Sequence, residues 1–303
     1  MRFRGLDLNL LVTLDRLLTE RNVSRAAEKL CLSQSATSGA LARLREYFDD
    51  ELLVQVGRKM TLTPRAEDLA VAIRNALMQI EATVIQQPTL EAATVKRNIR
   101  IMTSDYVATA FMSAAIREIQ REAPGLSFTL LAPKTDATAY LSRGLIDFAV
   151  MPERFLTSEH PSRHLFSDSH SVIVDENNAR IGDTPPDLET FMALRQVTVQ
   201  LADGPPNYES AIADLYGNRR EMDVIVANFA TVPIMIAGTD RAAIVHRRLA
   251  ELFCKIMPLR MFDAPMKLPL LRIGMQWHQL CDSDQVLRYV RSRLLEMRDD
   301  NAV

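Results

Sequence analysis

Between Ser24 and Phe48 the apolar residues recur at intervals of three and four, which predicts two short helices joined by a tight turn. Serine is a preferred N-cap residue, so we expect one helix to begin at Ser24 and the next at Ser33. The inner face of the second helix is predicted to carry Thr37, Ala40, Leu41, Leu44 and Phe48. Its opposite face is small and polar, with Gln34, Ser35, Ser38, Gly39, Ala42 and Arg45.

Small side chains allow a helix to approach the edge of a base pair closely. Gln and Ser can form hydrogen bonds with bases, and Arg can pair with a phosphate or with guanine. The outer face of the second helix is therefore a candidate reading face for duplex DNA, and Ser24, Arg25 and Ser33 at the helix starts complete the predicted contact set. The alternative is an ordinary amphipathic hairpin whose polar face is only solvated.

The next segment alternates in the manner of a β-hairpin, with strands expected at Leu52–Val56 and Met60–Leu62. Gly57, Arg58 and Lys59 form the predicted turn. Two adjacent cations at such a tip can lie against a phosphate or in a minor groove. A solvated hairpin tip is the alternative.

A long helix is predicted from Pro64 to the residues before Pro88. Its apolar positions follow a heptad rhythm: Ala66, Ala70, Ile73, Leu77, Ile80 and Val84. This rhythm predicts a helix that pairs with a second copy of itself, which would place two DNA-reading heads on two half-sites. Burial against the chain's own core would also explain the stripe.

From Asn98 onward, short apolar runs alternate with helical patterns, which is typical of parallel sheets covered by helices. Two such units in succession predict two α/β lobes with a ligand cleft at the carboxyl ends of their strands. Residues near those ends form the candidate effector site: Ser104, Asp105, Phe111, Thr135, His170, Pro206, Asn207, Phe229 and Thr231. Apolar faces with a few polar groups suit a flat hydroxylated ring. The alternative is that Phe111 and Phe229 are plain core residues.

Three segments near the N-terminus carry a family resemblance: DLNLL at Asp7–Leu11, SRAAEKLCLSQSATSGALARLRE from Ser24, and TPRAEDLA at Thr63–Ala70. Together they resemble the winged helix-turn-helix of the LysR-type transcriptional regulators. Ser35 stands where that family usually has Pro, and Gly39 where a long polar or basic residue often lies. These departures concern the bases that the protein prefers.

The C-terminal part is similar to the periplasmic-binding-protein-like effector domain of the same family. MTSDY at Met102–Tyr106, the run Ala227–Glu251, and QWH at Gln276–His278 resemble the branch that responds to aromatic inducers, including nodulation regulators and salicylate-type regulators. The resemblance implies an activator that assembles as a homodimer or homotetramer, with RNA polymerase as a further partner. It also implies that Phe111 and His170 lie in the inducer pocket.

The expected fold class is therefore α+β and α/β multidomain. Its predicted parts are a DNA-binding domain (1–63), a dimerisation helix (64–87), a hinge (88–97) and a two-lobed effector domain (98–303, with lobes 98–168 plus 270–303 and 169–269).

Charge alone does not identify a DNA-binding protein here. The net charge is −2, and residues 1–97 hold 14 Lys and Arg against 12 Asp and Glu. Three scattered cysteines and the lack of a membrane-length apolar run indicate a reduced, cytoplasmic protein.

No nucleotide-binding or hydrolase motif occurs in the sequence, so we expect no cofactor and no enzymatic activity. A small-molecule-binding or catalytic α/β protein, whose N-terminal helices only dimerise it, is the alternative. His160, His164 and His170 suggest a metal site only weakly, because a loop and a strand start separate them.

Overall fold

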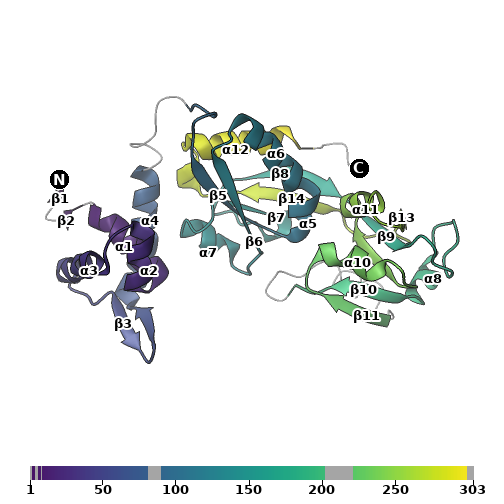
Figure 1. Ribbon diagram of the computed structural model, residues 1–303, viewed down its shortest axis with the longest axis horizontal. Helices are drawn as coiled ribbons and strands as arrows, with labels where there is room; N and C mark the ends of the chain where they lie inside the picture. The colour runs from purple at the N-terminus through teal and green to yellow at the C-terminus, as the bar shows by residue number, and fades with distance from the viewer. Residues whose placement is uncertain (1, 4–5, 8, 81–89, 202–220, 299–303) are drawn as a thin grey trace. The chain divides into compact units, whose positions relative to one another are not determined.

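The computed structural model describes residues 2–3, 6–7, 9–80, 90–201 and 221–298. It divides into two compact units (Figure 1). The first draws on residues 1–88, 142–145 and 280–285, and the second on the rest of the chain. The predicted fold class, a helix-turn-helix unit followed by a two-lobed α/β domain, is confirmed.

The first unit is a three-helix domain with a β-wing and a long following helix. After the short paired strands β1 (Arg2–Phe3) and β2 (Leu6–Asp7), its elements are α1 (Asn9–Glu20), α2 (Val23–Leu30), α3 (Gln34–Phe48), β3 (Leu53–Val56), β4 (Lys59–Leu62) and α4 (Pro64–Ile80). Its core contains leucines from three helices and the wing, and Leu14, Leu17 and Leu44 are fully buried. This core fixes α3 against α1 and leaves its other side outside.

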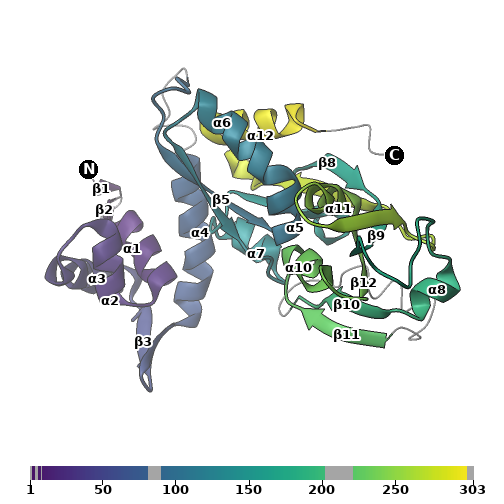
Figure 2. The same cartoon turned by 45° about the vertical axis from the view of Figure 1, so that its right-hand side comes forward.

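The first lobe of the second unit is a five-stranded sheet in the order β6-β5-β7-β14-β8. The strands are β5 (Arg97–Thr103), β6 (Leu126–Leu131), β7 (Phe148–Pro152), β8 (Ser162–Asp168) and β14 (Leu271–Gln276). The helices are α5 (Asp105–Val107), α6 (Ser113–Glu122), α7 (Ala137–Ser142) and α12 (Gln285–Glu296). Helices α6 and α12 lie side by side (Figures 1 and 2). The Tyr289 hydroxyl of α12 donates to the Glu122 carboxylate of α6 at 2.9 Å.

The second lobe is a five-stranded sheet in the order β11-β10-β12-β9-β13. Its strands are β9 (His170–Asp175), β10 (Arg195–Val199), β11 (Glu221–Val226), β12 (Ala242–His246) and β13 (Leu259–Asp263). Helices α8 (Leu188–Met192), α10 (Val232–Ile236) and α11 (Arg247–Cys254) accompany them. The chain passes between lobes twice, directly from β8 to β9 and again between β13 and β14.

The sheets differ from the purely parallel arrangement that the sequence pattern predicts. Strand β14 runs antiparallel to β7 and β8, and β9 runs antiparallel to β12 and β13. The two passages between the lobes bring strands into each sheet in the reverse direction. The sequence pattern also predicts a helix at 208–216, which lies outside the described residues.

Candidate nucleic-acid interface and inter-lobe site

Helices α2 and α3 form the predicted helix-turn-helix, and each has a side-chain cap. Asn22 caps α2 by accepting from the Arg25 amide at 3.0 Å, so the predicted cap at Ser24 is wrong by two residues. Ser33 caps α3, as predicted, by accepting from the Ala36 amide at 3.1 Å. Between the helices, Cys31 adopts a left-handed conformation that ends α2 sharply.

The inner face of α3 is the predicted one. Thr37, Ala40, Leu41 and Leu44 are buried against the domain core. The opposite face is open to solvent, and its exposed residues are Gln34, Ser35, Ser38, Gly39 and Ala42. Ser24 and Arg25 are exposed at the start of α2. The structure therefore presents a small, uncharged strip of α3 that no side chain of the described chain covers.

Arg45 does not extend this strip, in contrast to the prediction. Its Nε donates to the carbonyl of Glu51 at 2.8 Å, and a terminal nitrogen donates to the carbonyl of Leu53 at 2.9 Å. A salt bridge to the Glu51 carboxylate, at 3.2 Å, adds to these bonds. Arg45 therefore fastens α3 to the first wing strand, and its guanidinium is already engaged by the protein itself.

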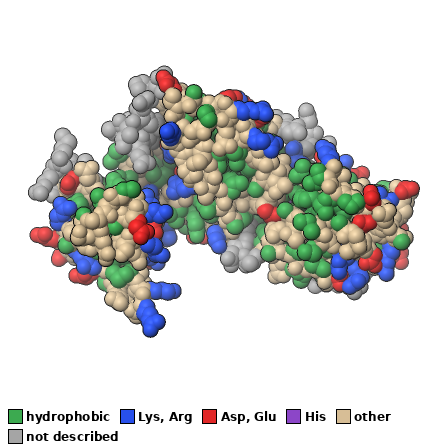
Figure 3. Space-filling model, viewed as in Figure 1, with side chains coloured by type: hydrophobic (Ala, Val, Ile, Leu, Met, Phe, Trp, Pro, Cys, Tyr) green, Lys and Arg blue, Asp and Glu red, His purple; other side chains and the backbone are tan. Residues whose placement is uncertain are grey.

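The wing presents its cations to solvent. Val56 pairs with Lys59, which leaves Gly57 and Arg58 as a two-residue turn. Gly57 has a φ of +62°, a conformation that favours glycine at the first turn position. Arg58 and Lys59 are exposed, and basic side chains mark the tip of the wing in Figure 3. Lys59 belongs to β4 rather than to the turn, a shift of one residue from the prediction.

In the first half of α4, residues of the heptad stripe pack against the core of the same chain. Ala66 and Ile73 are buried against the helix-turn-helix domain, so they cannot also form a seam with a partner helix. Ala70, Leu77 and Ile80 are partly buried, and Ala70 and Leu77 pack against the same core. Val84 lies outside the described residues. Burial within the chain, the alternative interpretation of this rhythm, therefore accounts for Ala66 and Ile73.

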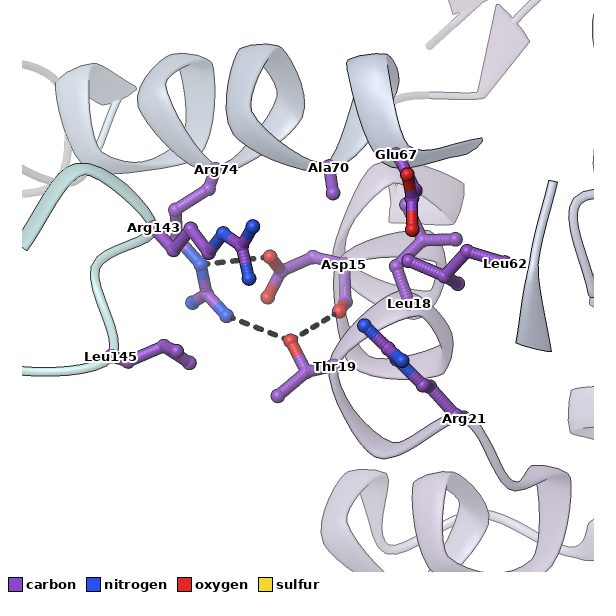
Figure 4. A pocket seen from close by; sticks show the side chains of 10 residues that line it. All are labelled: Asp15, Leu18, Thr19, Arg21, Leu62, Glu67, Ala70, Arg74, Arg143 and Leu145. Atoms are coloured by element: carbon purple, nitrogen blue, oxygen red, sulfur yellow. Dashed lines mark hydrogen bonds and ion pairs between the residues drawn. The ribbon is translucent and has the colours of Figure 1, made fainter. Parts of the chain in front are cut away.

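Polar contacts also join α4 to α1 within the first unit. Arg74 pairs with Asp15 at 2.8 Å and donates to the Thr19 hydroxyl at 3.2 Å. Thr19 in turn donates to the Asp15 carbonyl at 2.8 Å. Figure 4 shows this network beside a hollow of about 290 Å³. These contacts hold α4 against α1 within the first unit.

Several predicted effector residues lie at the junction between the two lobes of the second unit. Ser104 caps α5 by accepting from the Val107 amide at 3.3 Å. Asp105 reaches the other lobe, where its carboxylate accepts from the Ala230 amide at 2.8 Å. Phe111 lies in the π-helical turn η2 (Ala108–Met112), a feature that is frequent at functional sites.

Aromatic rings fill this junction. The Phe111 ring lies 5.1 Å from that of Phe166, and Phe229 lies 5.2 Å from His246, between ring centroids. His170 lies 5.0 Å from His246. Tyr106 connects the two sets, because its ring lies 6.5 Å from that of Phe166 and 6.1 Å from that of Phe229. Phe111, Phe229 and His170 thus belong to one group of contacting rings, and all three are buried.

The other predicted residues do not join the aromatic group. Thr231 bonds to Asn228 within the turn η4 (Phe229–Thr231), and Thr135 is exposed in the turn before α7. Pro206 and Asn207 lie outside the described residues.

Sequence reasoning missed the centre of this junction. The Tyr106 ring contacts that of His246 in a tilted arrangement, with centroids 4.2 Å apart, and its hydroxyl donates to Asp168 at 2.5 Å. The Arg248 amide donates to the same carboxylate at 3.2 Å, while its guanidinium lies 4.9 Å from the centre of the Phe166 ring. Tyr106 lies three residues after the end of β5, and His246 is the last residue of β12. Their positions at or just after strand ends were the signal available in the sequence.

Burial sets the charge state of the junction. It lowers the pKa of His170 to about 4, and it holds the pKa of His246 well below the usual value. It raises the pKa of both Asp105 and Asp168. Both imidazoles are therefore neutral near pH 7, and they present ring nitrogens and flat faces rather than positive charge.

The three histidines considered as metal ligands lie against different partners. The His160 ring lies 4.5 Å from that of His278, His164 contacts Glu153 at 2.6 Å, and the His170 ring lies beside that of His246. Within the described ranges, no group of three or more His, Cys, Asp or Glu is arranged to hold a metal ion.

Comparison with known families covers both units. Residues 8–67 match the bacterial regulatory helix-turn-helix protein of the lysR family, and residues 92–298 match the LysR substrate binding domain. The chain belongs to the LysR family. It is 40% identical over 299 residues to Nodulation protein D 1 of Mesorhizobium japonicum, which covers 98% of this chain and 94% of that protein. It is also 40% identical over 298 residues to Nodulation protein D 3 of Rhizobium meliloti, covering 98% and 95% of the two chains.

Solved structures of LysR-type architecture share the fold. A probable transcriptional regulator of Pseudomonas aeruginosa, PA0477, superposes with a TM-score of 0.69 at 28% identity over 98% of both chains. A full-length OxyR variant from the same organism gives a TM-score of 0.73 over 95% and 94% of the chains, at 15% identity, which shows the fold alone. This LysR-family chain is accordingly a DNA-binding transcriptional regulator and not an enzyme. No helix among its described residues is long and apolar enough to cross a membrane.

Proposed function

We propose that this LysR-family regulator activates transcription when a small aromatic inducer binds between the two effector lobes. The observation that carries the proposal is the aromatic junction itself. Tyr106 and Phe111 come from the first lobe, Phe229 and His246 come from the second, and neutral His170 lies where the chain passes between them. A flat hydroxylated ring requires such faces and a polar group at its edge.

The junction also suggests how an inducer acts. Asp105 of the first lobe accepts a hydrogen bond from the Ala230 amide in the turn η4 of the second, and Asp168 accepts from both Tyr106 and the Arg248 amide. A ligand that enters between the aromatic rings must change the spacing of these bonded elements. Only a ligand that binds two lobe arrangements with different affinity can shift the balance between them. The inducer therefore selects one arrangement of the lobes.

The DNA-binding part of the proposal assigns roles to the first unit. The exposed strip of α3 reads base edges in the major groove, and the wing cations contact phosphates. Two chains, as a homodimer or within a homotetramer, place two such units on two half-sites of double-stranded promoter DNA. A change in lobe packing then alters their spacing on DNA, and RNA polymerase is the partner that senses the result. Because the target is DNA, we expect the protein to act in the cytoplasm.

A thermal-stability screen tests the inducer. Phenols, chlorophenols, benzoates and flavonoids are added to the full chain, and a true ligand raises the melting temperature, because it stabilises the folded form by RT ln(1 + [L]/Kd). The His170→Ala and Phe111→Ala variants should lose most of that shift. His164→Ala, at a histidine bonded to Glu153 outside the junction, is the matched control and should keep it. Equal shifts in all variants would exclude the junction as the binding site.

A further inference from the structure

Gly39 occupies an energetically unfavourable place for a glycine. It lies near the middle of α3, which runs for 15 residues from Gln34 to Phe48, and it is exposed. A glycine inside a helix loses more backbone freedom on folding than any other residue and is less favourable there than all residues except proline. The residue therefore lowers the stability of α3, and a compensating reason is needed.

Packing within the chain does not supply that reason. A Cβ atom added at Gly39 would meet nothing within 4 Å beyond the helix's own backbone, and the backbone is in the ordinary helical region. Gly274 in β14 gives the contrast, because a Cβ there would lie 2.7 Å from Leu156. Gly274 is required by its neighbours inside the protein, whereas Gly39 faces open space.

The residues around Gly39 lie on the solvent-exposed face of α3, the face proposed to contact DNA. Ser35 and Ala42, which flank it along the same exposed face, are also small, and both are exposed. The core-facing residues Thr37, Ala40, Leu41 and Leu44 lie on the other side of the helix. The backbone at Gly39 therefore has no side chain over it and is flanked by small ones, on the surface that a LysR-family helix-turn-helix offers to a groove.

We propose that Gly39 determines DNA specificity, because its missing side chain lets the backbone of α3 lie directly against base edges in the major groove. The space that a side chain would fill is then occupied by the duplex. The inference rests on DNA reading by α3 and adds which position sets the closest approach. Any side chain at residue 39 would move the helix away from the bases or force it to select another sequence.

The test uses duplexes that the full-length protein itself selects from a random-sequence pool. We expect Gly39→Gln to bind the duplex chosen by the wild type at least about tenfold more weakly and to select a different sequence, since one base contact provides discrimination of this order. Affinity for an unrelated duplex at low salt should change little. Melting temperatures of both Gly39→Gln and Gly39→Ala should rise, which also shows that the variants fold.

A double variant distinguishes the effect of room at residue 39 from the effect of a flexible glycine in α3. Gly39→Ala combined with Ala36→Gly, at another exposed position of α3, keeps one glycine in the helix. If room at residue 39 matters, this double variant still binds the selected duplex more weakly than the wild type. Restored binding, or the same selected sequence and affinity for Gly39→Gln and the wild type, would overturn the inference. A wild-type protein that selects no sequence at all would contradict DNA reading by α3 itself, which is a separate and recognisable failure.

Discussion

The hydroxyl of Tyr106 donates to a carboxylate oxygen of Asp168 at 2.5 Å, and both side chains are almost fully buried. Tyr106 follows the first strand of one lobe, and Asp168 is the last residue before the chain passes into the other. The Arg248 amide of the second lobe donates to the same oxygen at 3.2 Å. One carboxylate therefore joins both lobes at their crossing point.

Tyr106→Phe removes this donor and keeps the ring. Because a buried carboxylate loses a hydrogen bond, we expect the free energy of unfolding to fall by about 1–3 kcal/mol, measured by urea denaturation. Tyr47→Phe, at an exposed tyrosine, is the control and should change stability little. Equal stability of the two variants would show that the bond contributes nothing.

Stability should depend on pH through His170, whose pKa is lowered to about 4 by burial. The folded form binds a proton less readily than the unfolded form, so this contribution is complete above pH 6.5 and is lost as the pH falls toward 4. The loss should amount to roughly 1–3 kcal/mol, since one pKa unit corresponds to about 1.4 kcal/mol.

The raised pKa values of Asp105 and Asp168 act in the opposite direction, because they favour the folded form as the pH falls. His246, whose pKa is lowered by burial and by the neighbouring His170, acts in the same direction as His170. The difference between the wild type and His170→Asn therefore reports His170 together with its effect on His246. His164→Asn supplies the matched comparison. Parallel stability curves for the wild type and His170→Asn between pH 7 and pH 4 would contradict the burial argument.

Substitution of Arg58 at the wing tip should affect DNA binding, whereas substitution of Arg45 in α3 should affect stability. Arg58 is exposed at the wing tip, so Arg58→Ala should reduce the dependence of log affinity on log salt concentration by about one, as expected for one lost phosphate contact. Fluorescence anisotropy at several salt concentrations measures this slope. Lys59→Ala should act similarly, and an unchanged slope in both variants would remove the wing from the interface.

Arg45→Ala should instead destabilise the domain. It removes two hydrogen bonds to the carbonyls of Glu51 and Leu53, and a net cost of about 1–3 kcal/mol is expected for charge-assisted bonds. The salt slope of DNA binding by the folded variant should stay close to that of the wild type. A lower slope with unchanged stability would restore Arg45 as a phosphate contact.

Ile73→Ala tests the role of the α4 stripe. Ile73 is buried in the helix-turn-helix core, so truncation should lower the free energy of unfolding by about 2–4 kcal/mol. Ile80→Ala, at a partly buried position farther along α4, should cost less stability. If Ile73→Ala dissociates oligomers in sedimentation experiments and leaves the free energy of unfolding unchanged, the stripe forms an interface with a second chain.

Local patterns predicted the helix-turn-helix well. The periodicity of Thr37, Ala40, Leu41 and Leu44 is a property of one helix, and it fixed which face is buried. The choice of Asn22 over Ser24 as a cap depends on where α2 begins relative to α1, which periodicity does not give. Arg45 carries a sequence signal for DNA contact, but the folded-back carbonyls of Glu51 and Leu53 engage it.

Contacts between distant segments were harder to predict. Phe111 and His170 were proposed from family resemblance, and Asp105 from its place after a strand. Their neighbours Tyr106, Asp168 and His246 meet only because the chain crosses between lobes and returns. Antiparallel β9 and β14 follow from the same crossings, and no local pattern records the direction in which a strand enters a sheet.

The central claim is that the exposed strip of α3 reads base sequence, and the binding of Gln34→Ala tests it most directly. Equilibrium affinities of the wild type and the variant are measured for the duplex selected by the wild type and for an unrelated duplex of equal length. The account predicts a loss of about tenfold or more on the selected duplex, the cost of one base contact, and almost none on the unrelated duplex. Equal effects on both duplexes, or no effect on either, would contradict it.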